Sequence, residues 1–216
     1  MNAREQILAD VRLALKRTTD APVLPIPGSA RIAPRVPGDA NAEIEMLLGE
    51  ITKLGGATRR ISRAEMRAAL AQIARDDAVK KATLWETQEL KAWDIADALR
   101  DLGIEIISPH ADKRALAECD LGITGADAAF PETGTLLLRS SPEKPRAVSL
   151  LPRVHLAIIT PEILRADLAP AFAEVKGEGY WVFVTGPSRT ADIELTVTIG
   201  VHGPKALRVW VMDGGS

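Results

Sequence analysis

Residues 185–194, TGPSRTADIE, gather polar side chains directly after the apolar run YWVFV. A Gly-Pro pair turns the chain where the expected strand ends. Beyond this turn, Ser188 and Thr190 offer hydroxyl groups, and Arg189 offers a planar fork of hydrogen-bond donors. Charge-assisted, bidentate hydrogen bonds are the strong ones, so such a set of donors suits a carboxylate or a phosphate. The segment is therefore a candidate site for a small anionic ligand.

Two carboxylates, Asp192 and Glu194, complete this segment. If residues 190–194 form a helical turn, both side chains lie favourably at its positive end. If a strand begins here, their two-residue spacing places both on one face. A third interpretation is a capped turn in which Arg189 pairs with one of them. The residue types leave a ligand site and a purely structural turn equally open.

A second polar group surrounds a glycine in residues 131–138, PETGTLLL. Gly134 would allow backbone amides to approach a ligand closely. Glu132 could act as a general base or accept a hydrogen bond from a hydroxyl, and Thr133 and Thr135 flank the glycine. The alternative is a turn that enters a strand, with a solvated glutamate.

Two further segments place polar residues beside glycines. His202 lies in GVHGP, residues 200–204, where it could transfer protons near neutral pH or serve as an ordinary surface histidine. Asp127 lies in GITGADAAF, residues 122–130, which is either a ligand loop or a turn stabilised by the aspartate. All four segments adjoin expected strands, so we expect them to meet at one rim of a sheet, with ligands at the carboxyl ends of its strands.

Composition excludes several classes of function. The net charge is −2, which gives no electrostatic reason to expect a nucleic-acid partner. We expect no membrane span and no signal peptide, because no apolar stretch is long enough and the N-terminus is charged throughout, so a cytoplasmic location is expected. The single cysteine, Cys119, cannot hold an iron–sulfur cluster alone, and the histidines at 110, 155 and 202 are too scattered to suggest a metal site.

Hydrophobic periodicity predicts alternating helices and strands from residue 39 onward. Helices are expected at 39–54, 62–75, 87–101, 111–118 and 162–176. Strands are expected at 57–62, 81–85, 104–108, 119–124, 135–139, 147–151, 155–160, 180–185, 195–199 and 207–212. This alternation is typical of an α/β fold with a mostly parallel sheet flanked by helices.

The N-terminal part differs from the rest of the chain. Residues 2–18 predict a helix with an apolar stripe, and residues 21–38 contain prolines that favour an extended arm. The domain organisation expected is therefore a helix and proline-rich arm at 1–38, followed by one α/β domain at 39–216. The sequence leaves open whether the helix docks on the rest of the chain or on another subunit, for example in a homo-oligomer.

Three stretches together resemble the lactate-utilization (LUD) domain family, and within it the short members without iron–sulfur motifs. They are GADAAFPETGTLLL, SLLPRVHLAII and VFVTGPSRTADIELTVTIGVHGPKALRVWVMD. The resemblance is strong over residues 120–213 and loose over 40–119. It implies a fold similar to the NagB/RpiA/CoA-transferase group. It also implies a part in an L-lactate dehydrogenase complex that oxidises L-lactate to pyruvate beside two iron–sulfur proteins, which would hold the clusters while this chain holds no cofactor.

The resemblance implies site candidates without an agreed division of catalytic roles. The family's hallmark residues fall on Glu132, Thr133, Gly134, Thr135, Gly186, Pro187, Ser188, Arg189, Thr190, Asp192, Glu194, His202 and Gly203. We expect Arg189 to hold a substrate carboxylate, and Glu132 or His202 to move the hydroxyl proton. The alternatives are a stand-alone α/β enzyme or binding protein for a phosphorylated or CoA-linked metabolite, or an assembly subunit without chemistry. Whether the chain itself is an enzyme and binds lactate stays open.

Overall fold

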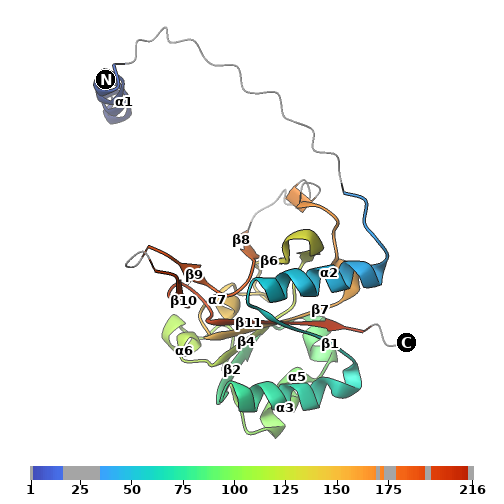
Figure 1. Ribbon diagram of the computed structural model, residues 1–216. Helices are drawn as coiled ribbons and strands as arrows, with labels where there is room; N and C mark the ends of the chain where they lie inside the picture. The colour runs from blue at the N-terminus through green and yellow to red at the C-terminus, as the bar shows by residue number, and fades with distance from the viewer. Residues whose placement is uncertain (1, 17–34, 169–170, 173–178, 193–195, 214–216) are drawn as a thin grey trace. The chain divides into compact units, whose positions relative to one another are not determined.

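A computed structural model describes residues 2–16, 35–168, 171–172, 179–192 and 196–213 (Figure 1). The chain divides into two compact units, Met1–Ala33 and Pro34–Ser216. In the first unit, helix α1 (Ala3–Ala14) begins at a capping box in which Asn2 and Glu5 satisfy each other's backbone amides. Its described end is earlier than the sequence predicted, and residues 17–18 lie outside the described part of the chain.

The second unit is built on a six-stranded parallel sheet with the order β1-β11-β7-β4-β2-β3. Its strands are β1 (Ala57–Ile61), β2 (Lys81–Leu84), β3 (Glu105–Ile106), β4 (Leu121–Thr124), β7 (Val154–Ile159) and β11 (Ala206–Met212). The central strands β4 and β7 are buried along their whole length, as apolar strands covered on both faces must be. The predicted α/β class with a mostly parallel sheet is confirmed.

Helices cover both faces of this sheet. They are α2 (Ala40–Lys53), α3 (Met66–Asp76), α4 (Gln88–Ala92), α5 (Ile95–Asp101), α6 (Lys113–Ala117) and α7 (Ala147–Leu150), with 3-10 turns at Arg63–Glu65, Pro131–Thr133 and Pro161–Ile163. Figure 1 shows α2 on one side of the sheet and α3 with α5 on the other. None of the helices in the described residues is long and apolar enough to cross a membrane.

A smaller antiparallel sheet lies on the α2 side, and sequence periodicity did not separate it from the main sheet (Figure 1). Its order is β5-β6-β8, and a two-stranded ribbon, β9–β10, follows. The bounds are β5 (Ala128–Phe130), β6 (Thr135–Arg139), β8 (Trp181–Val184), β9 (Arg189–Thr190) and β10 (Thr198–Ile199). Strand β10 is much shorter than the strand predicted at 195–199, of which residue 195 lies outside the described residues.

Three predicted elements differ from those in the structure. The predicted helix 87–101 is interrupted because Asp94 adopts a left-handed conformation, with φ 54°, between α4 and α5. The predicted helix 162–176 does not begin as expected, because residues 161–163 form a 3-10 turn and Leu164 bridges to Ala129. In its remainder, residues 168, 171 and 172 are helical as predicted, and residues 169–170 and 173–176 lie outside the described part of the chain.

The third difference is the strand predicted at 147–151, which was wrong because these residues form helix α7. The reason lies in Gly122 on β4. A Cβ atom on Gly122 would stand 1.9 Å from the carbonyl oxygen of Val148, so only glycine lets the short helix pack this closely on the sheet. Gly122 is the register partner of His155 on β7, and α7 therefore lies directly against that part of the sheet. Tertiary packing has overridden an apolar pattern that favoured a strand.

Helix α2 is anchored at its N-terminal half by an ion pair between a half-buried arginine and a buried glutamate. Glu43 is 5% exposed, and its carboxylate accepts hydrogen bonds from both terminal nitrogens of Arg35, one of them at 2.9 Å, and from the Gly38 amide at 2.7 Å. Arg35 Nε also donates to the Ala166 carbonyl at 3.1 Å. These bonds join the segment that precedes α2, the helix itself and the segment after β7.

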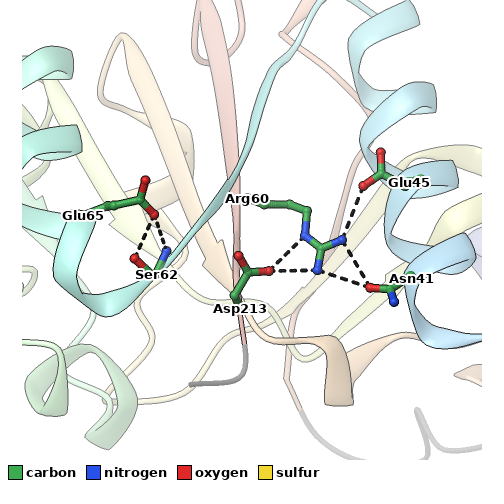
Figure 2. Close-up of polar contacts among 6 residues, drawn as sticks. All are labelled: Asn41, Glu45, Arg60, Ser62, Glu65 and Asp213. Carbon is green, nitrogen blue, oxygen red and sulfur yellow. Dashed lines mark hydrogen bonds and ion pairs between the residues drawn. The ribbon is translucent and has the colours of Figure 1, made fainter. Parts of the chain in front are cut away.

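A second polar cluster ties the edge strand β1 to its neighbours (Figure 2). Arg60 Nε donates to Asp213 at 2.9 Å, beyond the end of β11, and Nη1 donates to Asn41 at 3.2 Å on α2. Ser62 and Glu65 form a capping box at the start of the next helical segment. Arg60 therefore joins two strands and α2 at the carboxyl edge of the sheet.

We predict that Gly122→Ala lowers the free energy of unfolding by about 2–3 kcal/mol, because the added methyl group collides with the backbone of α7. Gly125→Ala is the matched control, since its Cβ would lie 3.7 Å from the Ile158 carbonyl, an ordinary contact. Urea unfolding of the two variants measures the difference. Equal stability of both would show that α7 does not lie against β4.

We predict that Arg35→Met destabilises the chain by on the order of 3 kcal/mol at neutral pH, because Glu43 becomes a buried carboxylate without its cation. The Arg35 hydrogen bonds lower the pKa of Glu43 below its usual value, so their contribution is complete above about pH 4.3 and disappears as the pH falls through the folded pKa. The cost of Arg35→Met should shrink over that acidic range. Lys53→Met, which breaks an exposed pair with Glu50, should cost about 0–1 kcal/mol at any pH.

Candidate functional site

A cavity of about 330 Å³ opens at the amino ends of β7 and β11. We call it the amino-edge cavity. It is lined by Ser149, Leu150, His155, Val182, Phe183, Val184, Thr185, Gly186, Pro187, Ser188, His202, Gly203, Pro204 and Leu207. Its walls are largely apolar, with hydroxyl groups and two imidazoles among them. Such a lining suits a small organic molecule with a few polar groups.

The segments that sequence analysis singled out are joined by a chain of hydroxyl groups. Thr133 Oγ1 donates to Thr135 Oγ1 at 2.8 Å, and Thr135 Oγ1 lies 2.9 Å from Thr185 Oγ1. These contacts form because β6 pairs antiparallel with β8, so that the start of one strand meets the end of the other. The PETGT segment therefore supports the cavity wall from behind, through Thr185.

The turn after β8 is joined in the same way to the loop before β11. The Ser188 amide donates to the Pro204 carbonyl at 3.0 Å, and the Gly200 amide donates to the Ser188 carbonyl at 2.9 Å. A Cβ on Gly203 would lie 3.1 Å from the Ser188 Cβ. Ser188 and His202 consequently line the same cavity, although the two residues come from different sequence segments.

Two glycines of these segments rest on the last turn of α2. Gly134 has φ +60°, and a Cβ there would lie 2.8 Å from the Ile51 amide nitrogen. Gly186 has φ +93°, and a Cβ there would lie 3.1 Å from the Leu54 carbonyl oxygen. Glycine is required at both positions by its positive φ and by the approach of the helix. The neighbour that approaches closely is α2.

Arg189 also contacts this helix end. Its Nη2 donates to the Leu54 carbonyl at 2.5 Å, which places a cation at the negative end of α2. Arg189 is absent from the residues that line the amino-edge cavity within the described chain. The structure therefore shows Arg189 as a group that fastens the turn 186–188 to the helix.

The remaining candidates that the structure describes lie away from the cavity lining. Glu132 is exposed on the 3-10 turn before Gly134, and its charge raises the pKa of Arg35, although less than the Glu43 hydrogen bond does. Thr190 lies in β9, and its hydroxyl accepts a hydrogen bond from the exposed Asp192 amide at 3.3 Å. Glu194 lies outside the described residues. Glu132, Arg189 and His202 thus face different surroundings.

The GITGADAAF segment lies at the opposite edge of the sheet, so the expectation that all four segments share one rim was wrong. Asp127 follows the carboxyl end of β4, where its carboxylate accepts hydrogen bonds from the Arg139 amide at 2.8 Å and from Lys144 at 2.6 Å. These bonds make Asp127 a turn-stabilising residue. The amino-edge cavity, by contrast, lies at the starts of β7 and β11. The sequence analysis expected ligands at the carboxyl ends of the strands and therefore did not predict this position.

His155 is a cavity residue that sequence reasoning missed. It is 1% exposed, and its Nε2 lies 2.8 Å from Thr124 Oγ1 on the neighbouring strand. Burial lowers the pKa of His155 to about 4, so the imidazole is neutral at physiological pH. The available signal was a histidine inside the continuous apolar run VHLAII, since a polar residue in a buried strand needs a partner.

Cys119 offers no reactive thiolate. It is buried, and its thiol donates to the Ala115 carbonyl at 3.5 Å. Burial raises the pKa of Cys119 to about 11, which keeps the thiol protonated. Across the described residues there is no group of three or more His, Cys, Asp or Glu side chains that could hold a metal ion.

The parallel sheet with helices on both faces makes this an α/β protein. A family model described as the LUD domain matches residues 44–212, and the chain therefore belongs to the LUD domain family. This match confirms the resemblance seen in the sequence. A crystal structure of a DUF162 family protein from Deinococcus radiodurans has the same fold, with a TM-score of 0.62 and 21% identity over 82% of this chain and 100% of that chain.

Curated relatives share parts of the sequence. The chain is 34% identical over 145 residues to lactate utilization protein C of Shouchella clausii, covering 62% of this chain and 63% of that protein. It is 38% identical over 104 residues to lactate utilization protein C of an Exiguobacterium species, covering 44% of this chain and 45% of that protein. The alignments thus span between about half and three fifths of those relatives.

We predict that the buried His155 does not titrate between pH 5 and pH 8 in the folded chain. The unfolded imidazole takes up a proton near pH 6.5, and the folded one takes it up only near pH 4. His155 therefore lowers the free energy of unfolding as the pH falls from 6.5 to 4. A histidine-labelled NMR titration measures it, with His155→Gln as the assignment control. A midpoint near 6.5 for His155 would show that solvent reaches the imidazole freely.

Proposed function

We propose that this chain is a subunit of an L-lactate utilization system that oxidises lactate to pyruvate, and that the amino-edge cavity binds the acid. The relatives named lactate utilization protein C support the role, and family membership supports its transfer to this chain. The observation that carries the site assignment is the convergence of TGPS and GVHGP on one cavity, with PETGT bonded behind it. These are the segments in which the family resemblance is strongest.

In this proposal, different residues of the cavity bind the acid and accept its hydroxyl proton. Oxidation of lactate breaks one O–H and one C–H bond, forms a carbonyl and releases two protons and two electrons. The exposed His202 at the cavity accepts the hydroxyl proton, since an imidazole exchanges protons near neutral pH. The hydroxyl groups of Ser188 and Thr185 donate to the acid's oxygens. Arg189 positions Ser188 by fastening the turn to α2.

The two electrons and the proton of the broken C–H bond go to partner proteins in this proposal. The buried, protonated Cys119 is unsuited to ligate a cluster, so in this proposal iron–sulfur proteins of the same system accept the electrons from the bound acid. The apolar side chains on and near the cavity rim, Phe183 at 40% and Val201 at 45% exposure, are a suitable contact for such a partner. Binding and proton transfer then fall to this chain, and electron transfer to its partners.

We expect His202→Ala and Ser188→Ala each to lower lactate-dependent electron transfer by about tenfold or more in the reconstituted system, because each removes a group that touches the acid. Cells that lack the chain should lose growth on L-lactate and regain it with the wild-type gene. Lys53→Ala, at an exposed site on α2, is the control and should restore growth fully.

Two results would contradict the proposal. One is normal lactate turnover with both cavity variants. The other is stabilisation of the purified chain by phosphate esters or CoA but by neither lactate nor pyruvate, which would assign the cavity to a different metabolite. Free ligand at about 100 times its dissociation constant should add roughly 2.7 kcal/mol to the free energy of unfolding.

A further inference from the structure

A second cavity, of about 120 Å³, lies at the opposite edge of the sheet from the amino-edge cavity. We call it the carboxyl-edge cavity. It is lined by Trp85, Thr87, Glu89, Leu90, Trp93, Gly125, Ala126, Lys144, Ile158, Ile159, Thr160 and Ile163. All of these residues except Lys144, which follows β6, end or follow β2, β4 and β7, and these three strands are neighbours in the sheet. The proposed lactate function uses none of them.

The topology singles out this position. From β2 the chain passes to β3 on one side, and it then returns to β4 on the other side and continues outward to β7 and β11. The winding direction therefore reverses between β2 and β4. In open parallel sheets, the crevice outside the carboxyl ends of two such strands is where ligands bind. Trp85 follows β2 and Gly125 follows β4, so both sides of the crevice contribute to the cavity.

The size and apolar lining of the cavity suit one flat ring. Its volume is close to that of an engineered apolar cavity of about 150 Å³ that holds benzene. Two indoles line it, and the Trp85 ring is held in place because its Nε1 donates to the Pro145 carbonyl at 3.1 Å. Aromatic side chains bind planar rings by stacking or edge contacts.

The charged groups of the lining argue for an uncharged ligand. Lys144 is already paired with Asp127 at 2.6 Å, and its ammonium lies 5.7 Å from the Trp85 ring centroid. Glu89 adds a carboxylate to the same lining. A bound anion would therefore meet as much negative as positive charge. The lining offers donors at Lys144 and acceptors at Glu89, which together match a neutral ligand with both kinds of group.

Thr87 adds a hydroxyl that the fold does not use at the helix start. It is the N-cap residue of α4, yet its side chain makes no capping hydrogen bond there. The residue is 7% exposed and lines the cavity. We infer that the carboxyl-edge cavity binds a single planar, uncharged ring that carries hydrogen-bond donors and acceptors, such as an amide-substituted heteroaromatic ring.

Ligand-observed NMR titrations of the full chain test this inference with three probes of similar size: nicotinamide, benzoate and toluene. Nicotinamide should bind at least tenfold more tightly than the anionic or the apolar ring. Trp93→Leu should weaken nicotinamide binding by about tenfold through loss of the aromatic contact. Thr87→Val, which keeps the side-chain shape, should weaken it by about fivefold through loss of one hydrogen bond.

Two control variants separate this site from the rest of the molecule. Lys91→Ala changes an exposed residue on the same helix α4 that does not line the cavity, and it should leave nicotinamide binding unchanged. His202→Ala, in the amino-edge cavity, should leave it unchanged too, so this test is independent of the lactate proposal. Absence of nicotinamide binding, equal binding of benzoate or toluene, or insensitivity to both Trp93→Leu and Thr87→Val in folded protein would overturn the inference.

Discussion

The docking of two glycine turns on the last turn of α2 is the constraint on which the amino-edge cavity depends. Gly134 and Gly186 both have positive φ, and both bring backbone within contact distance of that helix end. Arg189 secures the second turn through its hydrogen bond to the Leu54 carbonyl. With both turns held, the Thr135–Thr185 hydrogen bond forms and the cavity wall from Val182 to Ser188 is fixed. Side chains that resemble ligand-binding groups in the sequence thus act in part as the structure that holds the site in place.

Strand β7 connects the two cavities. His155, near its start, lines the amino-edge cavity, and Ile158 to Thr160, at its end, line the carboxyl-edge cavity. The strand is buried throughout and pairs with β4 and β11, so it is a rigid wall shared by both. The preference of parallel sheets for ligands at carboxyl ends applies to the second cavity. The amino-edge cavity exists because β8, the turn 185–188 and the loop 202–204 lie over that end of the main sheet.

The α/β class and the main strands could be predicted from the sequence because alternating helical and apolar strand patterns are strong local signals. The residues of the TGPS and GVHGP segments were recognised for their glycines and polar side chains, and seven of them, Ser188 and His202 included, do line one cavity. Helix α7 could not be predicted, since its packing depends on the absence of a side chain at Gly122, a residue distant in sequence. The surroundings of Arg189 depend on where α2 ends, and those of Glu132 depend on the position of Arg35. No local sequence pattern encodes either of these.

Hydrogen exchange in a Gly134→Ala variant tests the central claim most directly, because Gly134 contacts α2 but does not line the cavity. If the docking on α2 holds the wall, the amides of Ser188 and Gly200, which donate to Pro204 and Ser188, should exchange faster along with those of β6. Faster exchange limited to residues 131–136, with the Ser188 and Gly200 amides as protected as in the wild type, would contradict the account.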